Sequence, residues 1–147
     1  MESPVPELGT FGAVLRFALE LESATASFYE RAVAELEPDG PAILARELAA
    51  QHANRRTLLE RTRQQKLNEV VLEPITGLDG ARYVYDGTPA PRERILLRAV
   101  ALETVAERFY ADSGTVAKAL LTEAARTFRK LAEENARNAA RLRALGA

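Results

Sequence analysis

A glutamate followed seven residues later by a tyrosine occurs twice in this chain, as Glu22 with Tyr29 and as Glu103 with Tyr110. Seven residues make about two turns of an α-helix, so each glutamate shares a helix face with its tyrosine. The other residues of both faces are small or apolar, which predicts that the faces turn inward. A carboxylate inside a helix bundle is costly unless a cation or hydrogen-bond donors meet it. These residues can therefore bind a metal, form an ion pair or act as a base, depending on what faces them.

Two further helical segments place polar side chains three residues apart on apolar faces. One carries His52 and Arg55, and the other carries Asn135 and Asn138. The segments LAAQHANRRTLL and LAEENARNAARL align so that the first members of the two pairs match, and so do the second members. Together with the repeated glutamate and tyrosine, this alignment predicts two helical hairpins of one ancestry. Each hairpin supplies a glutamate from its first helix and a polar pair from its second.

This pattern resembles the ferritin-like di-iron proteins, most closely those of the rubrerythrin type. The strongest local match is the doubled run of a glutamate, six residues to a phenylalanine, and then a tyrosine, found in Glu22-Phe28-Tyr29 and Glu103-Phe109-Tyr110. In that family each hairpin supplies one Glu from its first helix and a Glu-x-x-His pair from its second, so that four carboxylates and two histidines hold two metals. The resemblance also implies that the tyrosines donate hydrogen bonds to the carboxylates.

The Glu-x-x-His pairs of the resembled family are not present here. In the alignment that the internal repeat favours, the family's second-helix glutamates fall on His52 and Asn135, and its histidines fall on Arg55 and Asn138. A competing alignment makes His52 the family histidine, with Ala49 in place of the glutamate. The rubrerythrin tail with its four cysteines is also missing, because the chain has no Cys.

Two hard cations need about four negative charges, which this set of residues does not offer. We therefore expect a metal-free polar core in which the Arg55 guanidinium replaces the metal and binds Glu22 through two hydrogen bonds. Glu103 has the poorer partners in this interpretation. The donors within its reach are Asn135, Asn138, Tyr29 and His52. We expect Glu103 to be either hydrogen-bonded or protonated. The alternative is a single iron or manganese ion held by Glu22, His52 and Glu103.

The spacing of apolar residues and of Pro and Gly predicts an all-α fold of four helices. We expect the helices over residues 10–37, 41–66, 92–112 and 116–145, with Thr10 as the first N-cap. Ser113-Gly114-Thr115 is interpreted as a short break between the last two helices. The connections are then short, long and short, which favours the ferritin-like arrangement of two hairpins joined by one long crossover.

The crossover is expected over residues 67–91, where Pro and Gly interrupt any helix. Residues 70–72 and 83–85 flank a turn-prone sequence and could form a small hairpin, and their apolar side chains should pack on the bundle or on a second copy of the protein. Residues 1–9 contain two prolines and few anchors, so they are expected to form a loose arm.

Length and composition limit the classes of protein. A chain of 147 residues with 47% hydrophobic residues predicts a single domain, spanning 1–147, with its own core. A net charge of -1 argues against nucleic acid and anionic membranes as partners. The lack of Cys, of a leader pattern and of a membrane-spanning apolar run is typical of a cytoplasmic protein.

Three functional hypotheses follow. The first is a ferritin-like bundle that has lost most di-iron ligands and serves as a non-catalytic binding or structural module, as a homodimer or another homo-oligomer. The second is a metal-dependent oxidoreductase or iron-handling protein with a reduced site. The third is a metal-free enzyme that uses Glu103 as a base, for which no other nucleophile or acid-base constellation offers support.

Overall fold

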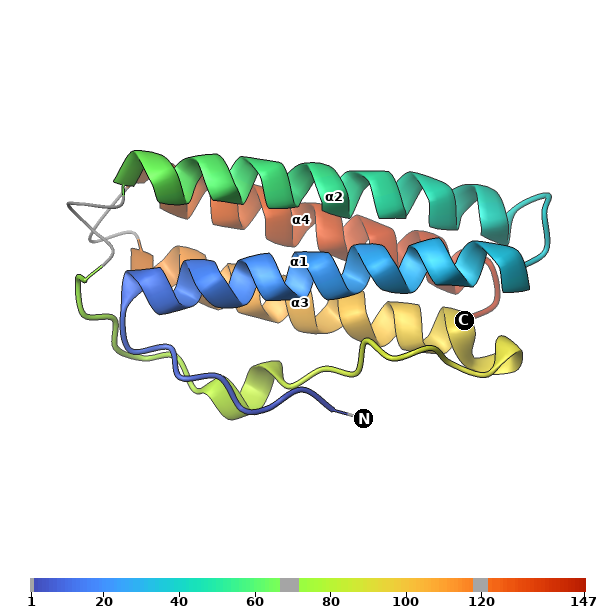
Figure 1. Cartoon of the computed structure of the whole chain (residues 1–147), viewed down its shortest axis with the longest axis horizontal. Coiled ribbons are helices and arrows are strands. Elements are labelled where there is room, and N and C mark those ends of the chain that lie inside the picture. The colour runs from blue at the N-terminus through green and yellow to red at the C-terminus, as the bar shows by residue number, and fades with distance from the viewer. Residues whose placement is uncertain (1, 67–71, 118–121) are drawn as a thin grey trace.

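The structure, a computed structural model, describes residues 2–66, 72–117 and 122–147 of the chain. Within these ranges it is all-helical, and the prediction of an all-α four-helix bundle is confirmed (Figure 1). The α-helices are α1 (Phe11–Ala32), α2 (Pro41–Lys66), α3 (Ile95–Ala117) and α4 (Thr122–Ala144). Three short 3-10 helices accompany them, namely η1 (Val33–Glu35), η2 (Gly80–Tyr83) and η3 (Arg92–Arg94).

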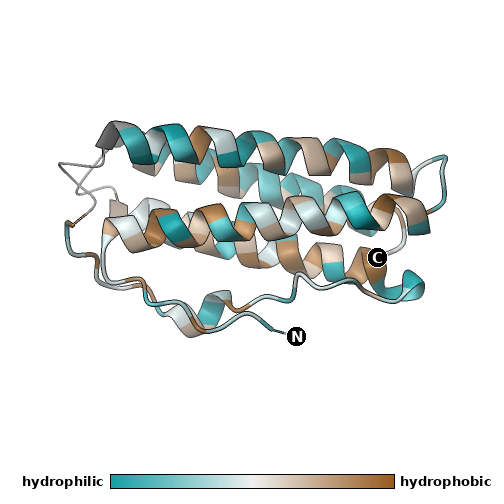
Figure 2. Ribbon diagram, in the orientation of Figure 1, coloured by the Kyte–Doolittle hydropathy of each residue, from teal (hydrophilic) through white to brown (hydrophobic). Residues whose placement is uncertain are grey.

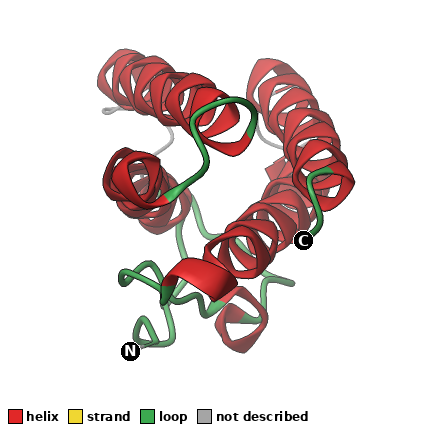
Figure 3. Ribbon diagram, turned by 90° about the vertical axis from the view of Figure 1, so that its right-hand side faces the viewer, coloured by secondary structure: helices red, strands yellow, loops and turns green. Residues whose placement is uncertain are grey.

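The bundle is made of two helix pairs. Helix α1 packs mainly against α2, and α3 packs mainly against α4. Seen along the bundle, the helices surround a common interior (Figure 3). Hydrophobic and hydrophilic residues are mixed along each helix (Figure 2), as expected for amphipathic helices that share one core.

The first two helices begin where the sequence predicts. The Oγ1 atom of Thr10 accepts a hydrogen bond from the backbone N–H of Ala13 at 3.1 Å, which caps α1. Helix α2 begins at Pro41, where the missing N–H of proline costs nothing. The α-helical part of α1 ends at Ala32 and tightens into η1, so it stops short of the predicted end at residue 37.

The predicted break at Ser113-Gly114-Thr115 is wrong, because α3 continues through it to Ala117. Ser113 and Gly114 are buried, and Gly114 lies against α4. A Cβ atom added at Gly114 would lie 3.3 Å from the carbonyl oxygen of Ala125 and 3.1 Å from the Cγ atom of Arg129. The glycine therefore allows close approach of two helices and does not end one.

The segment between α2 and α3 differs from the predicted hairpin. Its described part, residues 72–94, runs along the outside of the bundle beside α1 and α3 (Figures 1 and 3). Tyr83 belongs to the 3-10 helix η2 and not to a strand. The side chain of Asp79 caps the start of this helix by accepting a hydrogen bond from the backbone N–H of Ala81. Residues 70 and 71 lie outside the described residues, and Leu72 is 86% exposed.

Tyr83 anchors this segment to the bundle, as its apolar neighbourhood predicts. Its side chain is 1% exposed, and its ring lies against that of Phe109 with 5.5 Å between the centroids. Its hydroxyl donates a hydrogen bond to Asp112 at 2.5 Å. The aromatic ring and the polar tip thus both find partners on α3.

The N-terminal arm has more anchors than the sequence suggests. Its backbone is hydrogen-bonded to the connecting segment, with Ser3 donating to Tyr85 at 2.7 Å and Ile75 donating to Gly9 at 2.9 Å. Leu8 is buried in the core at 6% exposure. The arm and the connecting segment therefore cover one side of the bundle together.

Two hydrophobic clusters fill the two ends of the bundle. One joins the start of α1 to the end of α3 and the start of α4, and it includes the aromatic side chains of Phe11, Phe109 and Phe128. The other joins the end of α1 to the starts of α2 and α3, and it includes Leu48 and Leu102. Each α-helix carries buried polar residues between these two clusters, so the core is divided by a polar layer.

The contact at Gly114 gives a test of this packing. We expect Gly114→Leu to lower the free energy of unfolding by about 1–3 kcal/mol, because the new side chain must displace α4. The matched substitution Thr115→Leu, at the next and exposed position of α3, should change it by less than about 0.5 kcal/mol. Urea unfolding of both variants measures the difference. Equal effects would show that α3 and α4 are not closely packed at Gly114.

Candidate functional site

The polar layer contains every residue that the sequence analysis selected. All eight side chains are buried, with at most 4% exposure. They come from all four α-helices of the described chain, as Glu22 and Tyr29 of α1, His52 and Arg55 of α2, Glu103 and Tyr110 of α3, and Asn135 and Asn138 of α4. The layer therefore lies where the two helix pairs meet.

Glu103 has the larger number of hydrogen-bond donors, contrary to the expectation that it has the poorer partners. Its Oε2 atom accepts from the hydroxyl of Tyr29 at 2.6 Å and lies 2.8 Å from Nε2 of His52. Its Oε1 atom accepts from the amides of Asn135 at 2.7 Å and Asn138 at 3.1 Å. Burial alone would raise the pKa of Glu103, but the charge of His52 and these hydrogen bonds lower it to about 2. Glu103 is therefore ionised, and so low a pKa makes it a poor general base.

Glu22 is met by three donors from the other helices. Its Oε1 atom contacts Nδ1 of His52, and its Oε2 atom accepts from the hydroxyl of Tyr110. The predicted contact with Arg55 is present, but it is a single hydrogen bond of 3.5 Å from Nη1 and not the bidentate pair that we expected. Tyr110 makes a tyrosine-to-carboxylate hydrogen bond of the kind that the resemblance implies, whereas the metal-free interpretation did not assign His52 to Glu22.

Arg55 distributes its remaining donors over α4. Nη1 donates to the side-chain oxygen of Asn135 at 3.0 Å, while Nη2 donates to the backbone oxygen of Leu131 at 2.9 Å and to Glu134 at 3.1 Å. Burial lowers the pKa of Arg55, but the electrostatic effects of Glu22, Tyr110, Glu103 and Glu134 together outweigh burial, so the net shift of the pKa is upward. The guanidinium thus stays charged and links α1, α2 and α4.

His52 lies between the two carboxylates, with one ring nitrogen directed at each. Since an ionised carboxylate can only accept, both nitrogens must donate, which requires the imidazolium form. Burial by itself lowers the pKa of His52, but the charges of Glu103 and Glu22 raise it to about 9. The ring also stacks on that of Tyr29, with centroids 5.8 Å apart.

The two tyrosines exchange partners between the helix pairs. Tyr29 of α1 donates to Glu103 of α3, and Tyr110 of α3 donates to Glu22 of α1. Burial and the adjacent carboxylates raise the pKa of both tyrosines well above the usual value, so both keep their protons. Each glutamate is therefore held by the tyrosine of the other half of the repeat.

Two side chains that the sequence analysis did not select join the layer at its edge. Gln51 accepts a hydrogen bond from Asn138 at 2.6 Å, and Glu134 accepts a hydrogen bond from the guanidinium of Arg55 at 3.1 Å. Gln51 and Glu134 occupy the same position in the aligned segments, immediately before His52 and Asn135. The internal repeat therefore contained a signal that could have identified both.

The di-iron centre that the resemblance implies does not fit this set of donors. Glu22, His52 and Glu103 are brought together, but the raised pKa of His52 favours the imidazolium form, which has no free lone pair for a metal, and the guanidinium of Arg55 lies beside them. Over the described ranges, no group of three or more His, Cys, Asp or Glu side chains is arranged to hold a metal ion. What the site does hold is a balanced set of charges, with two carboxylates facing two organic cations.

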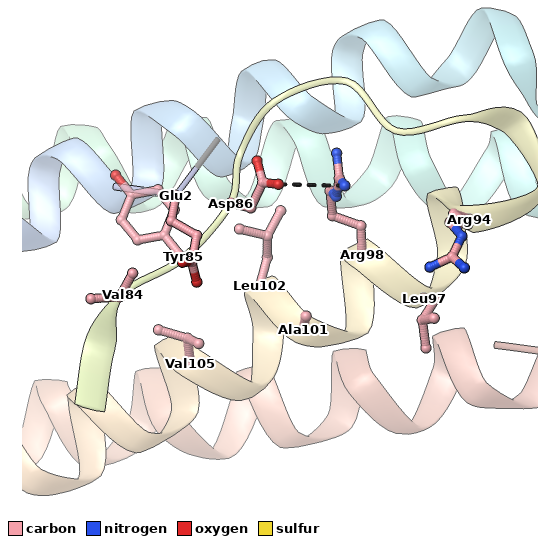
Figure 4. Close-up of a pocket in the computed structure, with 10 residues that line it drawn as sticks. All are labelled: Glu2, Val84, Tyr85, Asp86, Arg94, Leu97, Arg98, Ala101, Leu102 and Val105. Carbon is pink, nitrogen blue, oxygen red and sulfur yellow. Dashed lines mark ion pairs between the residues drawn. The ribbon is translucent and has the colours of Figure 1, made fainter. Parts of the chain in front are cut away.

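A surface pocket of about 310 Å³ lies on the outer face of α3 (Figure 4). It is lined by Tyr85 and Asp86 of the connecting segment and by side chains of α3 such as Leu97 and Arg98. Asp86 and Arg98 form an ion pair of 3.4 Å across it. None of the eight residues of the polar layer lines this pocket, so it is separate from the candidate site.

Comparison of the chain with protein-family models, curated proteins and solved structures finds no match. Among the helices in the described ranges, none combines the length and apolar character needed to cross a membrane.

Removing one carboxylate should test whether the layer stabilises the fold. We expect Glu22→Ala to lower the free energy of unfolding by about 3–5 kcal/mol, because it leaves His52 and Arg55 as buried cations with one partner fewer. Glu20→Ala, at an exposed position of the same helix, is the matched control and should change it by less than about 0.5 kcal/mol. Thermal and urea unfolding measure both. A Glu22→Ala variant as stable as the wild type would contradict the observed burial of the ion pairs.

The pKa shifts of His52 and Glu103 predict how stability depends on pH. The pKa of His52 rises from 6.5 to about 9, so its stabilisation is complete below pH 6.5 and is lost as the pH rises to 9. The pKa of Glu103 falls from 4.5 to about 2, so its stabilisation is complete above pH 4.5 and is lost as the pH falls to 2. We expect the highest free energy of unfolding between about pH 5 and 6.

His52 is the only histidine of the chain, so its ring signal in NMR reports the titration directly. We expect a midpoint near 9 in the folded protein, and a midpoint near 6.5 for the same chain in urea serves as the reference. A folded-state midpoint at or below 6.5 would mean that His52 is neutral in the layer.

Proposed function

We propose that this chain is a ferritin-like bundle of the rubrerythrin type in which a network of ion pairs has replaced the di-iron centre. It acts as a non-catalytic binding or structural module. The observation that carries the proposal is the position of His52 between Glu22 and Glu103, with Arg55 beside them. Two organic cations there balance the carboxylates that metals balance in the resembled family.

Two further observations support the ferritin-like part of the proposal. The path of residues 72–94 along the outside of the bundle is compatible with a long crossover between two helix pairs. The exchanged contacts of Tyr29 and Tyr110 relate the two halves of the internal repeat to each other.

A homodimer or other homo-oligomer is part of the same proposal. Large apolar side chains are exposed on α2 and α3, among them Ile43 at 56% and Leu97 at 57%. A second copy could cover such residues, since exposed apolar surface favours association. Sedimentation equilibrium of the purified chain measures the oligomeric state.

The proposal is tested by restoring the ligands of the resembled family. We expect the combined variant His52→Glu, Arg55→His, Asn135→Glu and Asn138→His to be less stable than the wild type without metal, because its four glutamates repel one another. Ferrous iron or manganese should restore its stability by about 2.7 kcal/mol at a metal concentration a hundred times the dissociation constant. Thermal melting with and without metal, together with bound metal per chain, measures this effect.

The wild type should show no bound metal and no change in melting temperature. The pair Ala53→Glu and Arg56→His, at exposed positions of α2 with the same spacing, controls for metal binding at the surface. Stoichiometric, tightly bound metal in the wild type would refute the proposal. It would favour the alternative of an iron-handling or oxidoreductase site at Glu22, His52 and Glu103.

A further inference from the structure

A groove of about 420 Å³ opens between α2 and α4 at the level of the polar layer. Polar side chains from both helices line it. They are Gln51, Asn54 and Arg55 of α2 and Thr127, Lys130 and Glu134 of α4. The groove thus reaches Arg55 of the buried network, and two acceptors of its guanidinium, Leu131 and Glu134, also line the groove.

The guanidinium of Arg55 presents one incompletely used edge. Nε and Nη2 form the side of the group on which a carboxylate or phosphate can accept two parallel hydrogen bonds. Glu134 accepts from Nη2 at 3.1 Å, whereas Nε is buried without a hydrogen-bond partner. Arg55 itself is 4% exposed. Arg55 therefore keeps an unpaired donor, Nε, next to Nη2, the atom that contacts the partly exposed carboxylate of Glu134.

We propose that this groove binds a small oxyanion, either a carboxylate or a phosphate, which replaces the Glu134 carboxylate on Arg55. The incoming anion accepts from Nε and Nη2 together, so it satisfies the donor that Glu134 leaves unpaired. The Glu134 side chain, which is 24% exposed, moves toward solvent when the ligand enters.

The rim of the groove supplies further groups that favour an anion. Lys130 adds a second positive charge, and the hydroxyl of Thr127 can donate. Gln51 uses its oxygen to accept from Asn138, which leaves its NH2 group to donate. With Glu134 turned away, the anion meets two cations and several neutral donors. The intramolecular carboxylate competes with it and keeps the affinity of the wild type modest.

This inference rests on the proposed function, because it names the class of ligand for a binding module. The two can fail separately. If the wild type binds neither metal nor anion, the groove proposal fails, but the proposal that the di-iron centre has been lost still holds. Metal bound to the wild type would refute that loss whatever the groove binds.

Calorimetric titration with sodium acetate and with sodium phosphate, against sodium chloride at equal ionic strength, tests the proposal. We expect saturable binding of one or both anions, and Glu134→Gln should bind at least about tenfold more tightly, which corresponds to about 1.4 kcal/mol. Lys130→Gln should bind about three- to tenfold more weakly. Tighter binding of phosphate identifies a phosphate site, and tighter binding of acetate identifies a carboxylate site.

Glu133→Gln is the matched control, since Glu133 is exposed and does not line the groove. It should bind like the wild type. In NMR, the Nε–H signal of Arg55 should shift on titration in step with the calorimetric binding curve. Lack of saturable binding by folded Glu134→Gln would overturn the proposal. So would an equal gain in Glu133→Gln, or an Arg55 signal that does not respond.

Discussion

The structure depends on neutralising two carboxylates in the middle of a hydrophobic bundle. Glu22 and Glu103 are both 0% exposed, and an ionised carboxylate without a partner is not tolerated there. His52 bridges the two, and Arg55 extends the network to α4. Because every α-helix of the described chain contributes to this layer, the contacts fix how the two helix pairs are positioned along each other. The apolar clusters on either side stabilise the bundle through the hydrophobic effect, which depends less on direction than the hydrogen bonds of the polar layer do.

Much of this arrangement is encoded in spacing. The seven-residue interval between Glu22 and Tyr29, and its repetition with Glu103 and Tyr110, predicts which face turns inward because helix geometry is regular. Helix ends were predictable where local chemistry sets them, as at Thr10 and Pro41. The break expected at Ser113-Gly114-Thr115 failed because a glycine permits close packing as well as a turn, and only the neighbouring helix decides between them.

The partners within the site were harder to predict than its members. Spacing along one helix says nothing about which side chain of another helix lies opposite, so Arg55 was assigned mainly to Glu22 although it makes most of its contacts with α4. The protonation of Glu103 depends on the sum of donors around it, which four helices determine together. The path of residues 72–94 has no strict periodicity, and Tyr83 of its 3-10 turn is held by Asp112, a residue distant in the sequence.

The exchanged contacts of Tyr29 and Tyr110 have the form of an isologous interface, in which residue i of one unit contacts residue j of the other and the reverse contact is also made. Here both units belong to one chain. Each glutamate takes part of its donors from its own hairpin, but its tyrosine comes from the other hairpin, so the buried network is complete only when both are docked. Docking and ordering of the hairpins are thereby coupled, which favours a single cooperative folding transition over stepwise assembly of two stable halves.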